Sequence, residues 1–305
     1  MEREPEHGID PQRLRGAVST EIVVIVSEMD PVAREVAHRW GTLPAAEGHV
    51  DGVPVRRLGP RALVVMRPGA HIHDEHVDER LPPELLRSRP TLVFPSIHRS
   101  ERNVPCLTVH PLGNPGAQAE VGGRPRTLVA TDPGRMASAL RLLAEGAGPL
   151  GLSATYEATH HGPEVGLPAL FIEIGYGELP RPPPEAVKVL AEVIPQLERS
   201  PADRVALGVG GGHYVPHFTE LTLRRRWAFG HLISRHALAE MDRATALAAY
   251  ERTAGAEGVV FARAEDARHP TLEGIGARLR EQDAPMRGRK PDEGVTGAAR
   301  SASGT

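Results

Sequence analysis

The chain has 305 residues, of which 40% are hydrophobic and 25% are charged, and its formal net charge is −3. This length and composition allow a substantial hydrophobic core, and the charge balance argues against a protein that is basic over its whole surface. No apolar run approaches the ~20 residues that cross a membrane, and the single cysteine, Cys106, excludes a disulfide within the chain. We therefore expect a cytoplasmic protein without a membrane partner, in which Cys106 is a buried core residue rather than a nucleophile.

Apolar runs of strand length alternate with stretches of helical spacing along the chain. Strands are predicted over residues 21–26, 53–58, 62–66, 91–94, 107–110, 152–158, 169–174 and 205–209, with a last short strand near Phe261. Helices are predicted over residues 31–40, 136–143, 184–197, 222–235 and 238–250. Asp30 and Pro31 suit the N-cap and the first position of the first helix, and Gly59-Pro60 suits a hairpin between the second and third strands. The alternation predicts an α/β fold with a partly parallel sheet.

The two ends of the sequence differ in composition from its body. Residues 1–18 are polar and predict an arm, whereas residues 19–280 carry the alternating pattern and predict one α/β domain. Residues 281–305 are rich in Arg, Gly, Ser and Ala and have no periodicity, which predicts a disordered tail.

The most distinctive stretch is EATHHGP, residues 157–163, which is followed by the apolar strand predicted over 169–174. Glu173 interrupts that strand, and a carboxylate inside a core is costly unless it meets a metal, a cation or hydrogen-bond donors. Gly162-Pro163 predicts a turn, so His160 and His161 are expected to end a strand and face a cleft.

A second stretch, GVGGGHYVPH at residues 208–217, places His213 directly after three glycines. Successive glycines let a backbone approach a ligand closely and expose its N–H groups, which suits a ribose-phosphate or an ester carbonyl. A tight turn without a ligand explains them equally well, because the loop lacks both the dinucleotide spacing and the P-loop lysine. Two histidine-rich loops in one chain predict a single composite site.

Several histidines follow apolar strands or lie in glycine-rich loops, accompanied by Glu157 and Glu173. Imidazoles and carboxylates suit Zn²⁺, whose catalytic sites need three protein ligands and leave one position for a water that can attack an ester. No HExxH motif or paired CxxC motif is present, so composition alone indicates a metal. A lone histidine of this kind is more simply a hydrogen-bonded strand-end residue, but the combination of His160, His161 and His213 favours function.

Two other polar clusters have simpler interpretations. The HIHDEH stretch at residues 71–76 resembles a metal cluster at first sight, but its polar surroundings favour a solvated loop or helix start. Arg224, Arg225 and Arg226 either hold an RNA backbone or form an exposed helix face.

Taken in their order, the motifs resemble the archaeal and plant type of D-aminoacyl-tRNA deacylase over roughly residues 20 to 265. The matching motifs are FPSIHRS (94–100), LTVH (107–110), EATHHGP (157–163), FIEIG (171–175), GGGHYVP (210–216) and Gly230-His231. The resemblance implies hydrolysis of the ester between a D-amino acid and the 3′ end of tRNA, with Zn²⁺ as the cofactor. It also implies a phosphorylase/hydrolase-like mixed sheet flanked by helices, with a part similar to peptidyl-tRNA hydrolase. The sequence departs from the family pattern at Tyr176 and at Arg235-His236-Ala237, on the expected rim of the site.

The resemblance and the residues together give a candidate site with tRNA as the partner; the oligomeric state stays open. Glu173 is expected to be a metal ligand, a group that orients a histidine, or the general base. The alternatives are a hydrolase of another acyl-tRNA or of a small acyl substrate, and a non-enzymatic RNA- or metal-binding protein. The catalytic candidates are His160, His161, Glu173 and His213; the metal-ligand candidates are His98, His110, His160, His161, His213 and His231; the substrate-binding candidates are Arg99, Gly210, Gly211, Gly212 and Tyr214.

Overall fold

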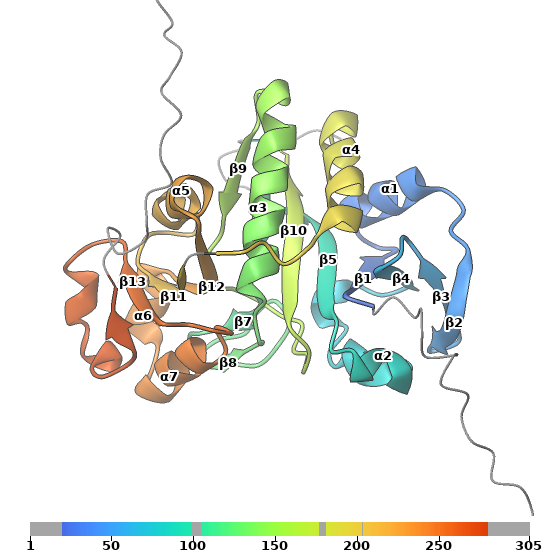
Figure 1. Cartoon of the computed structure of the whole chain (residues 1–305). Coiled ribbons are helices and arrows are strands. Elements are labelled where there is room, and N and C mark those ends of the chain that lie inside the picture. The colour runs from blue at the N-terminus through green and yellow to red at the C-terminus, as the bar shows by residue number, and fades with distance from the viewer. Residues whose placement is uncertain (1–19, 99–104, 177–180, 203, 280–305) are drawn as a thin grey trace, which may run out of the picture.

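The computed structural model describes residues 20–98, 105–176, 181–202 and 204–279. The predicted arm (1–18), the predicted tail (281–305) and Arg99 lie outside the described residues. Within these ranges the chain forms a mixed α/β fold in which helices flank a large mixed sheet, as Figure 1 shows.

The main sheet has the strand order β2-β3-β4-β1-β5-β10-β6-β9. Strands β1, β4, β5 and β10 run parallel, β6 is antiparallel to β10, and β9 is parallel to β6. The central strands are almost continuous apolar runs because both faces of the sheet are covered. The strands are β1 (Ile22–Ser27), β2 (Ala45–Val50), β3 (Val53–Arg57), β4 (Ala62–Arg67), β5 (Thr91–His98), β6 (Cys106–His110), β9 (Ser153–Tyr156) and β10 (Ala169–Gly175).

Different elements cover the two faces of the main sheet. One face packs against α1 (Pro31–Trp40), α3 (Pro133–Ala147) and α4 (Pro184–Val193). The other face packs against α2 (Pro83–Arg87) and the apolar side chains around it. The predicted N-cap of α1 is confirmed, because the Asp30 carboxylate accepts a hydrogen bond from Ala33 N at 2.8 Å.

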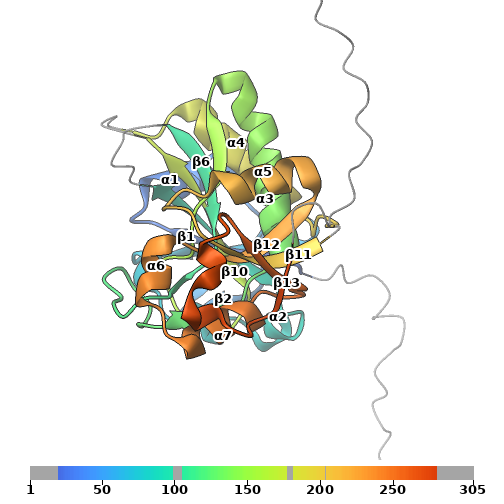
Figure 2. The ribbon, with the colours of Figure 1, turned by 90° about the vertical axis from the view of Figure 1, so that its left-hand side faces the viewer.

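A second, parallel sheet lies beyond the β9 edge of the main sheet, with the order β12-β11-β13-β14. Figure 2, seen from the side of this sheet, shows α5 and α7 on opposite sides of it. Strands β7 and β8 form a separate, short antiparallel pair. The remaining elements are β7 (Gly113–Asn114), β8 (Thr127–Leu128), β11 (Arg204–Val209), α5 (Pro216–Arg225), β12 (Trp227–Ile233), α6 (Arg235–Glu240), α7 (Arg243–Glu251), β13 (Gly258–Phe261) and β14 (Ala277–Arg278).

Most predicted elements are confirmed, and the errors have identifiable causes. The helix predicted over 222–235 is wrong: Arg226 adopts a left-handed φ of 55°, which ends α5, and the fully buried run from Trp227 to Ile233 is strand β12. The helix predicted over 238–250 is two helices, because Ser234 and Asp242 each cap a separate one. The predicted hairpin of β3 and β4 and the burial of Cys106 are confirmed.

Two polar stretches differ from their predicted structure. The strand predicted over 91–94 continues to His98, so the polar FPSIH stretch is part of the sheet rather than an exit from it. The stretch at 71–76 is not uniformly solvated, since His71 is buried and its Nε2 lies 3.1 Å from Ser96 Oγ. Across the described ranges, helices that combine the length and the apolarity needed to cross a membrane are absent.

Candidate active site

The register of the main sheet places three site residues on the same face of neighbouring strands. His98 is the last residue of β5 and His110 is the last residue of β6, while Glu173 lies between these strands on β10. The Glu173 carboxylate lies 3.5 Å from His98 Nδ1 and 3.6 Å from His110 Nε2. Glu173 is therefore a buried carboxylate that lies between two imidazoles.

Glu157 forms a second acidic centre in the same site. It follows β9 directly and its side chain is fully buried. Its carboxylate oxygens lie 3.2 Å from His98 Nδ1, 3.0 Å from His213 Nε2 and 3.6 Å from His160 Nε2. Glu157 is not among the residues predicted from the sequence to be catalytic or metal-binding; its position at the head of EATHHGP is the signal that could have identified it.

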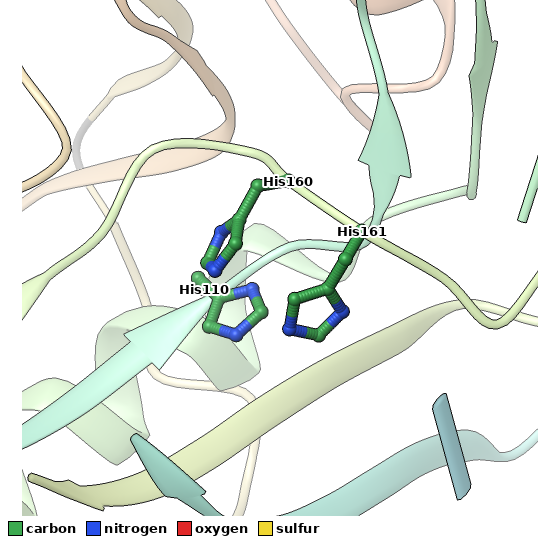
Figure 3. A group of neighbouring side chains, drawn as sticks. All are labelled: His110, His160 and His161. Atoms are coloured by element: carbon green, nitrogen blue, oxygen red, sulfur yellow. The ribbon is translucent and has the colours of Figure 1, made fainter. Parts of the chain in front are cut away.

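The turn after Glu157 points two imidazoles into the site. His160 Nδ1 lies 2.8 Å from Ala158 O, and His161 Nδ1 lies 2.7 Å from Gly162 O, so the Nε2 atom of each ring remains for other partners. The ring centroid of His110 is 4.1 Å from that of His160 and 4.9 Å from that of His161. Figure 3 shows these three rings turned toward one another, and Phe171 stacks on His110 at 5.0 Å.

The glycine loop adds His213 and Tyr214 from the second sheet. Ala158 N donates to His213 O at 2.8 Å, and Tyr214 Oη lies 2.8 Å from His98 Nε2. The structure thus brings the two histidine-rich loops together. At Gly210 (φ 113°) a Cβ would lie only 2.4 Å from the Asp266 carboxylate, so packing alone already requires glycine there.

Three overlapping groups of side chains have ligand atoms within 4.8 Å of one another, the arrangement that a metal ion needs. His110 Nε2 and both Glu157 oxygens are buried and make no hydrogen bond with the described residues. Buried polar atoms without hydrogen bonds are costly, so a cation in this position would satisfy them. The groups are His110, His160 and His161; His98, Glu157 and His213; and His110, Glu157 and Glu173.

The surroundings of the imidazoles shift their pKa values in opposite directions. Burial lowers the pKa of His161 to about 4 and the pKa of His160 well below its ordinary value, and neighbouring imidazoles add to both shifts. Burial also opposes the charged forms of His98 and His110, but Glu173 and Glu157 outweigh it and raise both pKa values. Against burial, His110 and His98 hold the pKa of Glu173 well below its usual range. These shifts favour an ionised Glu173 and neutral His160 and His161, and the neutral ring is the form in which histidine binds metals.

Two cavities meet at the glycine loop. One of about 540 Å³ is lined by His160, His161 and His213, by the loop around residues 114–121, and by α6. The other, of about 440 Å³, is lined by Gly210, Gly211, Gly212, Tyr214 and the side chains of Arg235 and Arg263, among others. Gly212 lines both cavities, so the two lie next to each other at the glycine loop.

Some candidates lie away from this cluster. His231 is fully buried, its Nδ1 lies 3.1 Å from Thr159 Oγ1, and it belongs to none of the three groups found among the described residues. Arg224 to Arg226 end helix α5 next to the first residues of β11 and β12, whereas the glycine loop follows the last residue of β11. The arginine run is therefore at the opposite end of the second sheet from His213.

The fold and the cluster define a mixed α/β protein with a buried histidine–glutamate site beside a cavity. The family model described as D-aminoacyl-tRNA deacylase matches residues 87–280. The D-aminoacyl-tRNA deacylase of Methanosphaerula palustris is 38% identical over 224 residues, which are 73% of this chain and 49% of the relative. That of Methanosarcina mazei is 37% identical over 198 residues, which are 63% of this chain and 65% of the relative. The chain belongs to the D-aminoacyl-tRNA deacylase family, which confirms the resemblance predicted from its motifs.

The same comparisons set the extent of the likeness. The chain spans only 49% and 65% of the length of these two relatives. A crystal structure of a conserved protein of unknown function, AF0625, has a similar fold, with a TM-score of 0.75 and 25% sequence identity over 87% of this chain and 96% of that one. The likeness to AF0625 therefore covers the main sheet and the second sheet together.

Proposed function

We propose that this chain hydrolyses the ester of D-aminoacyl-tRNA, releasing the free D-amino acid and tRNA. Membership of the family supports the reaction, and the relatives carry the name D-aminoacyl-tRNA deacylase. The observation that carries the proposal is the cluster of His110, Glu157 and Glu173 with His160 and His161, the last two of which line a cavity that opens to solvent. Ester hydrolysis needs an activated water, and imidazoles and carboxylates are the groups that activate one.

We propose that Zn²⁺ is the cofactor and that His110, His160 and His161 hold it. The neutral state of His160 and His161 and the unbonded Nε2 of His110 support this choice. His98, Glu157 and His213 form a second possible ligand set. When bound, Zn²⁺ lowers the pKa of a water ligand to near neutrality and so supplies hydroxide for attack on an ester.

The carboxylates have separate roles in this proposal. Glu157 lies within 3.6 Å of three imidazoles and its oxygens have no hydrogen bond among the described residues, so it is placed to accept a proton from the attacking water. Glu173 lies between His98 and His110 and fixes the orientation of both rings. Tyr214 holds His98 from the other side.

The cavities suggest how the substrate lies. We place the aminoacyl group in the cavity lined by His160, His161 and His213, and the terminal ribose along Gly210, Gly211 and Gly212. On the resemblance we also assign tRNA as the partner, the cytoplasm as the location, and the phosphorylase/hydrolase-like and peptidyl-tRNA hydrolase-like character of the fold. His231, also a predicted ligand, is left out of the proposed ligand set because it belongs to none of the three groups found among the described residues.

The test compares release of D-tyrosine and L-tyrosine from their charged tRNAs, with and without a zinc chelator. We expect loss of the D-form alone, blocked by the chelator and restored by Zn²⁺. Absence of hydrolysis of either form by folded, zinc-loaded protein would overturn the function. D-specific hydrolysis that resists the chelator would keep the reaction and overturn the metal.

Variants separate the enzyme from a binding protein. His161→Ala is expected to reduce D-tyrosine release to the uncatalysed background and to lower the zinc content measured by mass spectrometry. His38→Ala is the matched control, because His38 is an exposed histidine on α1 that lines neither cavity at the glycine loop and belongs to none of the three candidate groups. If His161→Ala kept full turnover, the assignment of this centre would be wrong.

A further inference from the structure

We propose that Glu75, which lies outside the histidine cluster, is a positioning residue that holds the turn carrying His160 and His161. It belongs to the HIHDEH stretch, whose part in the molecule the proposed function does not explain. The proposal rests on the proposed function only for its kinetic readout; the positioning itself is a property of the chain.

The Glu75 carboxylate joins two backbone segments that border the site. Its Oε1 accepts a hydrogen bond from Gly123 N at 2.6 Å, and its Oε2 accepts one from Glu164 N. Gly123 lies in the loop between β7 and β8, and Glu164 follows the Gly162-Pro163 turn. Because each carboxylate oxygen binds a different segment, one side chain fixes their separation.

These two segments are also in direct contact behind His161. Gly162 N donates to Val121 O at 3.0 Å, and Gly113 N donates to His161 O at 2.7 Å. A Cβ built on Gly162 would lie 2.3 Å from Gly123 N, so the two backbones approach as closely as glycine allows. A shift of Gly123 must therefore displace Gly162 and, with it, His161.

The backbone of His161 needs such support. Its φ is 39°, in the left-handed region that is unfavourable for a residue with a Cβ. Residues in this conformation persist only where surrounding contacts impose it, and they concentrate at functional sites. The hydrogen bonds that hold this backbone include those from Gly113 N to His161 O and from Gly162 N to Val121 O.

The stretch that carries Glu75 is itself firmly attached. Asp74 Oδ2 lies 2.6 Å from Arg67 Nε at the end of β4, and Asp78 Oδ2 accepts a hydrogen bond from Gly166 N at 2.9 Å. His71 Nε2 lies 3.1 Å from Ser96 Oγ on β5. Contacts with the main sheet thus hold the residues around Glu75 in place, and the hydrogen bonds of Glu75 restrict the movement of the turn.

The experiment compares Glu75→Gln and Glu75→Ala with Glu79→Gln as the matched control. Glutamine keeps the size of the side chain but can accept at only one of its two terminal atoms, so one amide loses its partner; alanine removes both bonds. Glu79 follows this stretch, in the short turn at residues 77–80, and its exposed carboxylate pairs with the exposed ring of His76. We expect kcat for D-tyrosyl-tRNA to fall in the order wild type, Glu75→Gln, Glu75→Ala, with KM unchanged and with a loss of about 10- to 100-fold in the last, as for other groups that orient metal-binding residues.

A spectroscopic readout makes the test independent of activity. The imidazole ¹H–¹⁵N signals of His161, assigned by their absence in His161→Ala, are expected to shift in both Glu75 variants and to stay in place in Glu79→Gln. Unmoved His161 signals in folded Glu75→Ala would overturn the proposal, as would wild-type kcat in that variant. If the wild-type chain released no D-tyrosine, the proposed function would fail, while the His161 signals would still decide whether Glu75 positions the turn.

Discussion

At the scale of single residues, the imidazoles of the site differ in the direction of their pKa shifts, because their burial and their neighbours differ. His98 and His110 lie against carboxylates, and their pKa values are raised even though burial opposes this. His160 and His161 share their surroundings mainly with other imidazoles, and their pKa values are lowered. Two opposite shifts within one cluster are typical of sites that bind metals or move protons.

His231 gives a prediction about stability and pH. Burial lowers its pKa to about 3, and the charge of Arg252 adds to the shift. In the unfolded chain the pKa is about 6.5, so the neutral ring contributes stability above that pH and the contribution is lost as the pH falls toward 3. We expect the free energy of unfolding in urea to fall between pH 7 and 5 with a slope that is smaller in His231→Gln than in the wild type, by up to about 1.4 kcal/mol per pH unit.

The same variant tests the predicted metal role of His231. Since His231 belongs to none of the three candidate groups, zinc content is expected to stay at the wild-type level in His231→Gln. His236→Gln, in which an exposed ring is replaced, serves as the control for the pH slope. An unchanged slope together with lost zinc would show that His231 is a ligand after all.

At the scale of elements, the sequence is most informative where burial is continuous. Strands β1 and β10 are apolar runs bounded by polar residues and are predicted close to their true positions, whereas only the apolar first half of β5 is predicted. Strand β12 has the same character, but the preceding arginines and the helical spacing of Trp227 and His231 favour a helix in the prediction. Its strand conformation depends on pairing with β11, a contact that local sequence does not contain.

The candidate site shows the same limit. The motifs identify the loops that meet, because glycines and paired histidines are visible in the sequence. They do not identify which side chains meet, since that depends on strand register: Glu173 lies opposite Ser96 on one side and Thr108 on the other, which places it between His98 and His110. Glu157 contacts His213, and His231 contacts Thr159 instead of the cluster. Both contacts join residues that are far apart in the sequence, so local patterns do not reveal them.

Asp30 gives a prediction about how α1 is joined to the main sheet. Its carboxylate caps α1 through Ala33 N and also accepts hydrogen bonds from Ser96 Oγ at 2.8 Å and Ile97 N at 3.0 Å. Loss of a cap costs about 1 kcal/mol, and each buried donor left without a partner costs about 1–3 kcal/mol more. We expect Asp30→Ala to lower the free energy of unfolding by about 3 kcal/mol in urea titrations.

Asp242 provides the comparison for Asp30. It caps α7 in the same way through Thr245 N, but its side chain is exposed and binds no second strand. Asp242→Ala is therefore expected to cost clearly less than Asp30→Ala. Equal losses in the two variants would mean that the bonds from Asp30 to β5 contribute nothing.

At the scale of the whole molecule, the two sheets share one hydrophobic core. Val24 of β1, Leu140 of α3 and Phe229 of β12 belong to a single buried cluster that continues into α5. Backbone hydrogen bonds from Ala158 to His213 and from Thr159 to Leu232 join the sheets beside the site. Because the site draws side chains from both sheets, its geometry depends on their remaining together.

The two tryptophans allow the predicted single domain to be tested. Trp40 lies on α1 beside the main sheet, and Trp227 is fully buried at the start of β12, where it stacks with Phe229. Trp227→Phe leaves Trp40 as the fluorescence reporter of the main sheet, and Trp40→Phe leaves Trp227 as the reporter of the second sheet. Because one core connects them, we expect fluorescence and far-ultraviolet circular dichroism to give coincident unfolding curves within each variant, with zinc and with a chelator. If the main-sheet reporter and the second-sheet reporter each departed from the circular dichroism curve of its own variant, the sheets would unfold separately, and the site would lie between two domains rather than inside one.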